Sequence, residues 1–185
     1  MLSEIRWHGR GGQGIVTVSR LLAYAGLYDG KYVQAFPEFG PERRGAPVTG
    51  YTRISDEPIT IHSHIYMPNI VVVVDPTLIG AIDVTKGLVE NGTIIANTDK
   101  QPEELGRRLG VRNARVCTVD AVRIALDILG RPIYNTAMLG ALARGVKLVT
   151  LESINRVIRE RFPGAVGEKN IAAIARAYEE AKIVG

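Results

Sequence analysis

The chain has 185 residues, of which 46% are hydrophobic and 23% are charged, a composition typical of one globular domain that spans residues 1–185. Its formal net charge of +4 is a mild excess and no long basic run accompanies it, so we expect no nucleic-acid partner. The single cysteine, Cys117, excludes an intrachain disulfide and an iron–sulfur cluster held by thiolates of this chain alone.

A glycine-rich stretch near the N-terminus is the most informative part of the sequence. A strand-like run ends at His8, four glycines follow within the next six residues, and an amphipathic run begins at Ile15. Glycine tolerates positive φ and close approach of another group, and the N–H groups of a loop that precedes a helix suit a phosphate or a carboxylate. We therefore predict an anion- or nucleotide-binding loop, although a tight strand-to-helix turn without a ligand has the same sequence. The candidate binding residues are Gly9, Arg10, Gly11, Gly12, Gln13 and Gly14.

Three of these glycines, at positions 9, 11 and 14, match the dinucleotide-binding pattern G-x-G-x-x-G. That pattern also requires an acidic residue about 20 positions later, at the end of a second strand. Glu38 follows a strand-like run, but the prolines at positions 37 and 41 turn the chain away from a crossover helix. A dinucleotide site is therefore the weaker interpretation of the loop.

The stretch from residue 15 to residue 65 predicts a helix, a strand, an irregular loop and a hairpin. Apolar residues at helical spacing predict a helix over Ile15–Leu27, and Lys31–Phe36 is predicted to be a short strand. The loop over Pro37–Pro47 contains three prolines and several charged residues, and loops of this length tend to be functional. The β-branched runs Val48–Ser55 and Ile59–Ile65 predict a hairpin, which makes the sheet mixed rather than wholly parallel.

The middle of the chain alternates strands and helices. The apolar run Ile70–Val74 predicts a strand that is buried on both faces. Asp75 could be catalytic, but an aspartate before Pro76 is more typical of a helix N-cap followed by proline at the first helical position. The further elements predicted here are a helix over Gly80–Val89, a strand over Thr93–Asn97, a helix from Pro102 to Gly110, a strand over Ala114–Val119 and a helix from Asp120 to Gly130.

The last third of the chain predicts three helices, over Asn135–Arg144, Leu151–Phe162 and Glu168–Lys182. Thr150 is a natural N-cap for the second of them. Residues 1–130 are therefore predicted to form a sheet with helices on both faces, and residues 131–185 add a helical cover. The predicted fold is a three-layer α/β/α domain with a mixed, mainly parallel sheet, Rossmann-like, with a hairpin insertion and a helical C-terminal third.

The sequence lacks an assembled catalytic set. His62 and His64 would lie on the same side of a strand, but no metal-binding motif accompanies them or His8, so we expect no metal site. Neither a nucleophile elbow nor a Walker loop is present, so we assign no catalytic residue. The apolar runs are too short to cross a membrane, and we expect a cytoplasmic protein without a membrane partner. A binding loop without catalytic residues indicates a subunit of a larger assembly.

Four separated motifs, in the same order, resemble those of the γ subunit of 2-oxoacid:ferredoxin oxidoreductases. The resemblance extends over nearly the whole chain and is strongest for the type that serves pyruvate and branched-chain 2-oxoacids. The four motifs, and a fifth match in the last predicted helix, are His8–Gly14, Gln34–Pro47, Val72–Pro76, Asn135–Gly140 and Glu168–Asn170.

The resemblance implies an oxidative decarboxylation, in which a 2-oxoacid, coenzyme A and oxidised ferredoxin yield an acyl-CoA, CO2 and reduced ferredoxin. In that family thiamine diphosphate, Mg²⁺ and 4Fe–4S clusters lie on the alpha, beta and delta subunits, so this chain would hold no cofactor alone and would meet ferredoxin only indirectly. The γ part is associated with coenzyme A, whose phosphates suit the guanidinium groups of Arg43 and Arg44. The same loop could instead contact a partner subunit, and the interface candidates are Glu38, Phe39, Pro41 and Glu42.

Other interpretations stay open. The chain could be a free-standing NAD(P)-binding enzyme of Rossmann-like fold, or an assembly module whose loops only dock partners. Related γ-like parts also occur in the 2-oxoglutarate and indolepyruvate enzymes, and the second motif does not distinguish these substrates. Because the 2-oxoacid should bind near the thiamine diphosphate, we expect another chain to select it.

Overall fold

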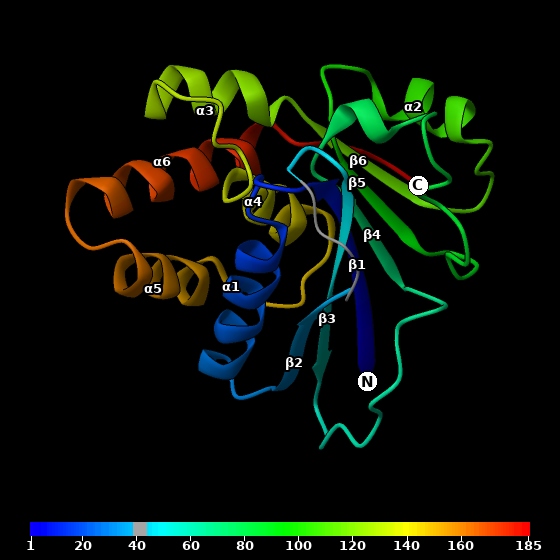
Figure 1. Ribbon diagram of the computed structural model, residues 1–185, viewed down its shortest axis with the longest axis horizontal. Coiled ribbons are helices and arrows are strands. Elements are labelled where there is room, and N and C mark those ends of the chain that lie inside the picture. Colours follow the sequence, from blue (N-terminus) through cyan, green and yellow to red (C-terminus); the bar gives the residue numbers. More distant parts are fainter. Residues whose placement is uncertain (39–43) are drawn as a thin grey trace.

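A seven-stranded sheet runs through the computed structural model, which describes residues 1–38 and 44–185 (Figure 1). Its strands are β1 (Leu2–Arg10), β2 (Tyr32–Pro37), β3 (Pro47–Ser55), β4 (Ile70–Val73), β5 (Thr93–Asn97), β6 (Arg115–Val119) and β7 (Lys182–Val184). The strand order is β2-β3-β1-β4-β5-β6-β7. Strands β1, β4, β5 and β6 are parallel, whereas β3 is antiparallel to β1 and β2, and β7 is antiparallel to β6. The predicted mixed sheet with a parallel centre is confirmed.

Helices cover both faces of the sheet and give the predicted three-layer fold (Figure 1). One face packs against the larger group, which consists of α1 (Ile15–Tyr28), α3 (Ala121–Leu129), α4 (Ala137–Gly145), α5 (Leu151–Arg161) and α6 (Ala165–Glu180). The other face packs against the one-turn helix η1 (Pro76–Leu78) and α2 (Pro102–Leu109). Within residues 1–38 and 44–185, no helix is long and apolar enough to cross a lipid bilayer.

Strand β4 is buried on both faces of the sheet, which explains its unbroken apolar sequence. Successive side chains of a strand point to opposite faces of the sheet. Val72 therefore packs with Ile95 and Leu139 in the larger core, whereas Val71 and Val73 pack in the smaller core under α2. All three valines are fully buried. A strand with helices on both sides requires an apolar residue at every position.

One predicted strand is wrong, because Ile59–Ile65 forms no strand pairing. The hairpin in this region consists of β2 and β3 instead, and it supplies the antiparallel part of the sheet. Strands β1 and β2 occupy both edges of β3, so residues 59–65 have no free edge there to join. The buried guanidinium of Arg53 holds this segment by donating to the carbonyl oxygen of Ser63 (2.8 Å). His62 and His64 consequently do not share one side of a strand.

The predicted helix over Gly80–Val89 is also wrong, since the chain forms successive turns there. Gly80 and Gly87 have φ values of +91° and +74°, which a right-handed helix does not contain. A Cβ atom at position 87 would lie 2.2 Å from the carbonyl oxygen of Tyr66, so this glycine also permits a close approach of two chain segments. These backbone requirements outweigh the helical spacing of the apolar residues.

The other predicted elements are confirmed, with shifts at their ends. The caps predicted at Asp75, Asp120 and Thr150 each accept a hydrogen bond from a backbone N–H two or three residues later. The last helix begins at Ala165 rather than at Glu168, and it ends at position 180. The residues that follow form β7, which the sequence analysis missed and which pairs with β6.

The contact between α4 and α6 depends on a glycine. A Cβ atom at Gly140 would lie 2.1 Å from the carbonyl oxygen of Ile174 in α6. Gly106 in α2 is the opposite case, because a Cβ atom there would lie 3.6 Å from a methyl group of Val116, an ordinary contact. Gly140 therefore serves helix packing, and Gly106 does not.

We expect these two glycines to respond in opposite ways to alanine. Gly140→Ala should lower the free energy of unfolding by about 1–3 kcal/mol, because the added methyl group forces α4 and α6 apart. Gly106→Ala should raise it by roughly 0.5–1 kcal/mol, because alanine is the better helix former. Denaturant titration of both variants measures the difference. Equal stability of the two variants would show that the close approach is not required.

Candidate functional site

Strands β1 and β4 are parallel neighbours, so their carboxyl ends lie side by side at the same edge of the sheet (Figure 1). The strand order reverses between them. From β1 the chain continues to β2 and β3 on one side, and from β4 it continues to β5 and β6 on the other. Ligands of open α/β sheets bind in the crevice at such a switch point. The glycine loop follows β1 and Asp75 follows β4, so the candidate site lies at this switch point. Residues 9–14, Asp75, Thr77 and Tyr134 are together called the switch-point crevice here.

The glycine loop makes the predicted strand-to-helix turn. Strand β1 continues through Gly9 and Arg10, and Gly14 is the N-cap residue of α1, in the left-handed region at φ +70°. Gly12 also has a positive φ, of +92°. A Cβ atom at Gly9 would lie 2.2 Å from Cδ1 of Ile15, so this glycine lets the helix approach the strand.

Part of the hydrogen-bonding capacity of the loop is used within the chain. The N–H of Arg10 donates to Oε1 of Gln13 (2.7 Å), and the N–H of Gln13 donates back to the carbonyl oxygen of Arg10 (3.0 Å). The N–H of Gly11 donates to a carbonyl oxygen of the segment before β3 (2.9 Å). The N–H groups of Gly12 and Gly14 have no hydrogen-bond partner among residues 1–38 and 44–185.

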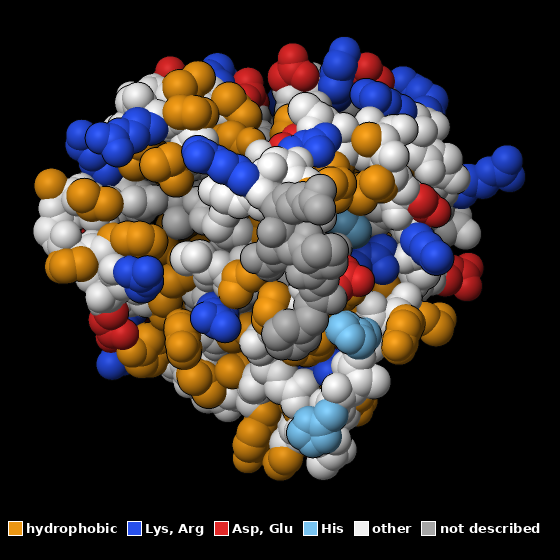
Figure 2. All heavy atoms as spheres, viewed as in Figure 1, with side chains coloured by type: hydrophobic (Ala, Val, Ile, Leu, Met, Phe, Trp, Pro, Cys, Tyr) orange, Lys and Arg blue, Asp and Glu red, His pale blue; other side chains and the backbone are white. Residues whose placement is uncertain are grey.

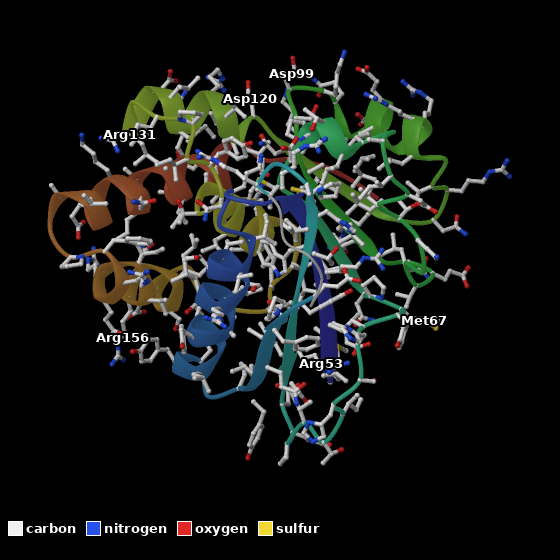
Figure 3. All side chains as sticks on the ribbon, viewed as in Figure 1. Arg53, Met67, Asp99, Asp120, Arg131 and Arg156 are labelled. Atoms are coloured by element: carbon white, nitrogen blue, oxygen red, sulfur yellow. The ribbon has the colours of Figure 1, made fainter. Side chains whose placement is uncertain are left out.

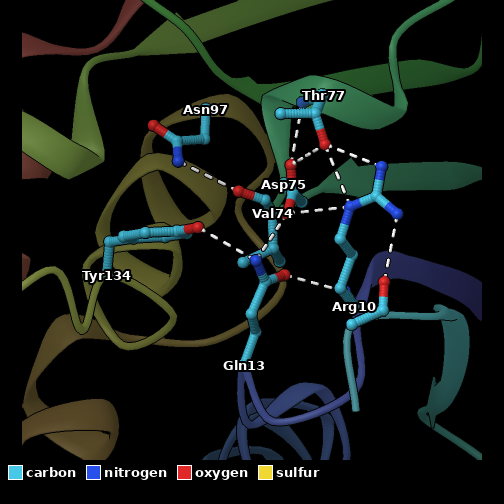
Figure 4. Close-up of polar contacts among 8 residues, drawn as sticks. Arg10, Gln13, Val74, Asp75, Thr77, Asn97 and Tyr134 are labelled. Carbon is cyan, nitrogen blue, oxygen red and sulfur yellow. Dashed lines mark hydrogen bonds and ion pairs between the residues drawn. The ribbon is translucent and has the colours of Figure 1, made fainter. Parts of the chain in front are cut away.

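The side chain of Gln13 connects the loop to Asp75 (Figure 4). Its Nε2 donates to Oδ2 of Asp75 (2.5 Å) and to Oη of Tyr134 (3.1 Å). The Nε of Arg10 lies 3.5 Å from the same Oδ2 and donates to Oγ1 of Thr77 (3.0 Å). The crevice thus already holds one anion of its own, the carboxylate of Asp75, which is only 4% exposed.

Asp75 is both the predicted N-cap and the anchor of the loop. Its Oδ1 accepts hydrogen bonds from the backbone N–H of Thr77 (2.8 Å) and from the Thr77 hydroxyl (2.6 Å). Burial raises the pKa of this carboxyl group, but the hydrogen bonds from Thr77 and Gln13 and the charge of Arg10 outweigh burial and leave the pKa below its ordinary value. The contact with Gln13 and the role of Tyr134 were not predicted from the sequence. The position of an aspartate directly after a buried strand was the available signal.

Two asparagines link the crevice to the helices. Asn97, at the end of β5, donates to the carbonyl oxygen of Val74 (2.9 Å) and accepts from the N–H of Ala121 (3.0 Å) at the start of α3. Asn135, which precedes α4, donates to the carbonyl oxygen of Gly14 (3.2 Å). The helical third of the chain therefore helps to fix the N-terminus of α1.

The structure describes two of the candidates predicted in the second loop, Glu38 and Arg44. Arg44 is exposed, forms an isolated bridge with Gly11, and has its Cγ 3.9 Å from the position of a Cβ atom at Gly12. The structure therefore brings Arg44 to the glycine loop. Glu38 contacts β3 instead, where its Oε2 accepts from Oη of Tyr51 (3.4 Å). The remaining candidates of this loop, Phe39, Pro41, Glu42 and Arg43, lie outside the described residues.

Two buried ionisable groups of the sheet, His8 on β1 and Tyr51 on β3, are uncharged at pH 7. The Nε2 of His8 accepts a hydrogen bond from Nε of Arg6 (3.0 Å), and burial together with this guanidinium lowers the pKa of His8 to about 4. Burial, and then the charge of Glu38, raise the pKa of Tyr51 to about 12. The described part of the chain contains no group of three or more His, Cys, Asp or Glu side chains that could hold a metal ion.

The fold and the crevice define a Rossmann-like domain that presents a glycine loop at a switch point, and comparisons identify its family. A profile of the family described as pyruvate ferredoxin/flavodoxin oxidoreductase matches residues 4–180. The chain is 53% identical over 180 residues to the common subunit gamma of the pyruvate/ketoisovalerate oxidoreductases of Pyrococcus furiosus, with 97% of each chain covered. It is 50% identical over 182 residues to pyruvate synthase subunit PorC of Methanothermobacter marburgensis, with 98% of this chain and 99% of that chain covered. The crystal structure of pyruvate oxidoreductase subunit PORC from Thermotoga maritima has 44% sequence identity and a TM-score of 0.88, over 100% of this chain and 99% of that chain.

The chain therefore belongs to the pyruvate ferredoxin/flavodoxin oxidoreductase family, as the gamma subunit of a pyruvate/ketoisovalerate ferredoxin oxidoreductase. The family predicted from the four motifs is confirmed, and so is the assignment to an enzyme subunit. A subunit of a multi-subunit oxidoreductase implies partner subunits.

We expect Asp75→Asn to destabilise the protein in a pH-dependent way. The amide would turn an N–H donor toward the Nε2 donor of Gln13, which should cost about 1–3 kcal/mol at neutral pH. Because the pKa of Asp75 is depressed in the folded state, its contribution is present above the unfolded pKa and is lost as the pH falls through the folded pKa. The difference in Tm from the parent should therefore shrink below about pH 4.

Thermal unfolding of both proteins between about pH 7 and pH 3 measures this difference. Asp99→Asn is the matched control, because Asp99 is exposed and lies at the same end of the sheet (Figure 3). Its Tm should follow that of the parent at every pH. A difference for Asp75→Asn that does not change with pH would show that the charge of Asp75 does not stabilise the crevice.

Proposed function

We propose that this subunit contributes coenzyme A binding and assembly to the oxidoreductase, rather than redox or thiamine chemistry. The observation that carries the proposal is the position of Arg44 beside Gly11 and Gly12, in a loop whose N–H groups at Gly12 and Gly14 have no hydrogen-bond partner among the described residues. A guanidinium group and backbone donors at a helix N-terminus together suit the phosphates of coenzyme A. The positive end of the α1 dipole adds to this attraction.

The two arginines of the crevice have different roles in this proposal. Arg10 is committed to the loop, because it donates to Thr77 and to the carbonyl oxygen of Gly45 (3.1 Å) and faces Asp75. It therefore supports the binding surface and neutralises the internal carboxylate, which would otherwise repel a phosphate. Arg44 is exposed and is the cation that would contact the ligand.

The proposed reaction converts pyruvate or a branched-chain 2-oxoacid, coenzyme A and oxidised ferredoxin to an acyl-CoA, CO2 and reduced ferredoxin. Thiamine diphosphate, Mg²⁺ and 4Fe–4S clusters would lie on the alpha, beta and delta subunits of a cytoplasmic complex, and ferredoxin would dock there. Another chain would select the 2-oxoacid. Because this chain would not distinguish the substrates, 2-oxoglutarate and indolepyruvate are the alternatives. This chain would hold coenzyme A so that its thiol reaches the partner that carries the acyl group.

The outer face of α1 favours the assembly role. Tyr24 and Leu27 are 54% and 52% exposed, and they line one shallow groove together with Tyr28. Figure 2 shows hydrophobic side chains gathered over this part of the molecule. Contiguous exposed apolar side chains mark protein contacts, so we propose that a partner subunit covers this face.

We expect Arg44→Ala to raise the KM for coenzyme A in the reconstituted complex. Loss of a charge-assisted hydrogen bond costs roughly 1.5–3 kcal/mol, which corresponds to about a 10- to 150-fold change. The KM for the 2-oxoacid should stay nearly constant, because that substrate binds on other chains. Steady-state kinetics measure both constants.

Arg112→Ala is the matched control for Arg44→Ala, since it removes one exposed arginine from the loop between α2 and β6. It should change neither KM. A change in subunit yield alone would assign Arg44 to an interface. If Arg44→Ala changes neither the subunit yield nor the KM for coenzyme A, Arg44 has neither the binding role nor the interface role.

The isolated chain should not turn over any 2-oxoacid, because the redox and thiamine groups are proposed to lie on its partners. The assay contains the purified chain, pyruvate, coenzyme A, thiamine diphosphate, Mg²⁺ and a viologen acceptor. No sustained viologen reduction is expected until the partner subunits are added. Sustained reduction by the isolated chain would refute this division of labour.

A further inference from the structure

A cavity of about 480 Å³ lies between helices α1, α5 and α6 and the connection from α3 to α4, next to the glycine loop. Its volume is within the roughly 300–1,000 Å³ of small-molecule sites. Asn135 lines the cavity and also donates to the carbonyl oxygen of Gly14, so it joins the two places. The other residues that line the cavity are distinct from those of the crevice.

Three cationic side chains from three elements line this cavity. They are Arg131 after α3, Arg161 at the end of α5, and Lys169 on α6; Figure 3 shows Arg131 beyond the end of α3, on the side of α6. Within residues 1–38 and 44–185, no carboxylate lines the cavity and none of the three cations forms an ion pair. The neighbouring Arg159, by contrast, pairs with Glu168 (2.8 Å). The cavity thus concentrates positive charge that its own surroundings do not compensate.

The walls between the cations are apolar. Ile133 and Val166 are 51% and 58% exposed, and Leu129 lines the same cavity. Covering such branched side chains releases hydration water and favours binding. A ligand for this cavity therefore combines negative charge with a planar or apolar part.

Two buried asparagines, Asn135 and Asn170, line the cavity and are hydrogen-bonded within the chain. Asn170, which is 6% exposed, accepts from the hydroxyl of Thr136 (2.7 Å) and donates to the carbonyl oxygen of Val166 (2.8 Å). Asn135 donates to the carbonyl oxygen of Gly14, and its buried Oδ1 has no hydrogen-bond partner among the described residues. Side chains that are already ordered before the ligand binds lower the entropic cost of binding.

We propose that this cavity binds a phosphorylated ligand of nucleotide size. One guanidinium is sufficient for a single carboxylate, whereas three uncompensated cations match the multiple charge of a pyrophosphate or a phosphomonoester. The proposal goes beyond the function proposed above, because it stands on Arg131, Arg161 and Lys169 rather than on Arg44 and the glycine loop. A free nucleotide and the nucleotide end of coenzyme A share this chemistry.

Calorimetric titration of the full chain with ADP at low ionic strength tests the proposal. ADP should bind, adenosine and inorganic pyrophosphate should each bind more weakly, and added salt should weaken the binding of ADP. Lys169→Glu and Arg131→Glu should each weaken ADP binding about 10-fold or more. Arg112→Glu makes the same change of charge on a distant exposed loop and should leave the affinity unchanged.

Further arms identify the source of the ligand and separate this proposal from the preceding one. Arg44→Ala tests the preceding proposal through the KM for coenzyme A in the reconstituted complex, whereas Lys169→Glu and Arg131→Glu test this one through the ADP affinity of the full chain, so that either proposal can fail alone. Displacement of ADP by coenzyme A would assign the cavity to the nucleotide end of coenzyme A, and no displacement would assign it to a separate nucleotide; both results support the proposal.

Two results would overturn it. One is the absence of ADP binding to the parent chain, and the other is ADP binding that neither Lys169→Glu nor Arg131→Glu weakens. If ADP does not bind and the same variants lose partner subunits on copurification, the cavity is a subunit contact rather than a ligand site.

Discussion

The carboxylate of Asp75 is the group on which the arrangement of the crevice depends. A buried carboxylate is stable only when hydrogen bonds and opposite charge replace the water that it has lost. Gln13 and Arg10, both from the loop after β1, supply part of that replacement, and Thr77 supplies the rest. The end of β4 therefore determines the conformation of the loop that precedes α1.

Arginine serves two different purposes in this chain. Arg53, which is 1% exposed, pairs with Glu4 (2.7 Å) and holds a loop against the sheet, and Arg10 is likewise committed to internal partners. Arg44 and Arg131 are exposed instead, Arg44 beside the glycine loop and Arg131 at the cavity between α1, α5 and α6. The net charge of +4 does not reveal this division, because it counts the paired Arg53 and Arg10 in the same way as the exposed Arg44 and Arg131.

Local signals in the sequence predicted the elements that depend on local interactions. The caps at Asp120 and Thr150 accept from backbone N–H groups three residues later, and the turn before α1 has glycine at positive φ, so short patterns identify all three. The strand predicted over Ile59–Ile65 failed because strand pairing depends on which edges other strands already occupy. The contact of Gln13 with Tyr134 spans 121 positions, and no short pattern reports it. The sequence thus identified the loop of the site but not the side chains that hold it.

The strand β7 determines when the sheet becomes complete during synthesis. Strand β6 has β5 on one edge and β7 on the other, and β7 comes from residues 182–184, which follow the whole helical layer in the chain. While α3 to α6 are being made, the outer edge of β6 therefore exposes unpaired N–H and C=O groups, which can pair with a strand of another molecule. A ribosome-bound chain is most open to this mispairing just before residues 182–184 emerge. Once they pair, the strand facing solvent is three residues long and begins with the exposed Lys182, a poor template for a further strand.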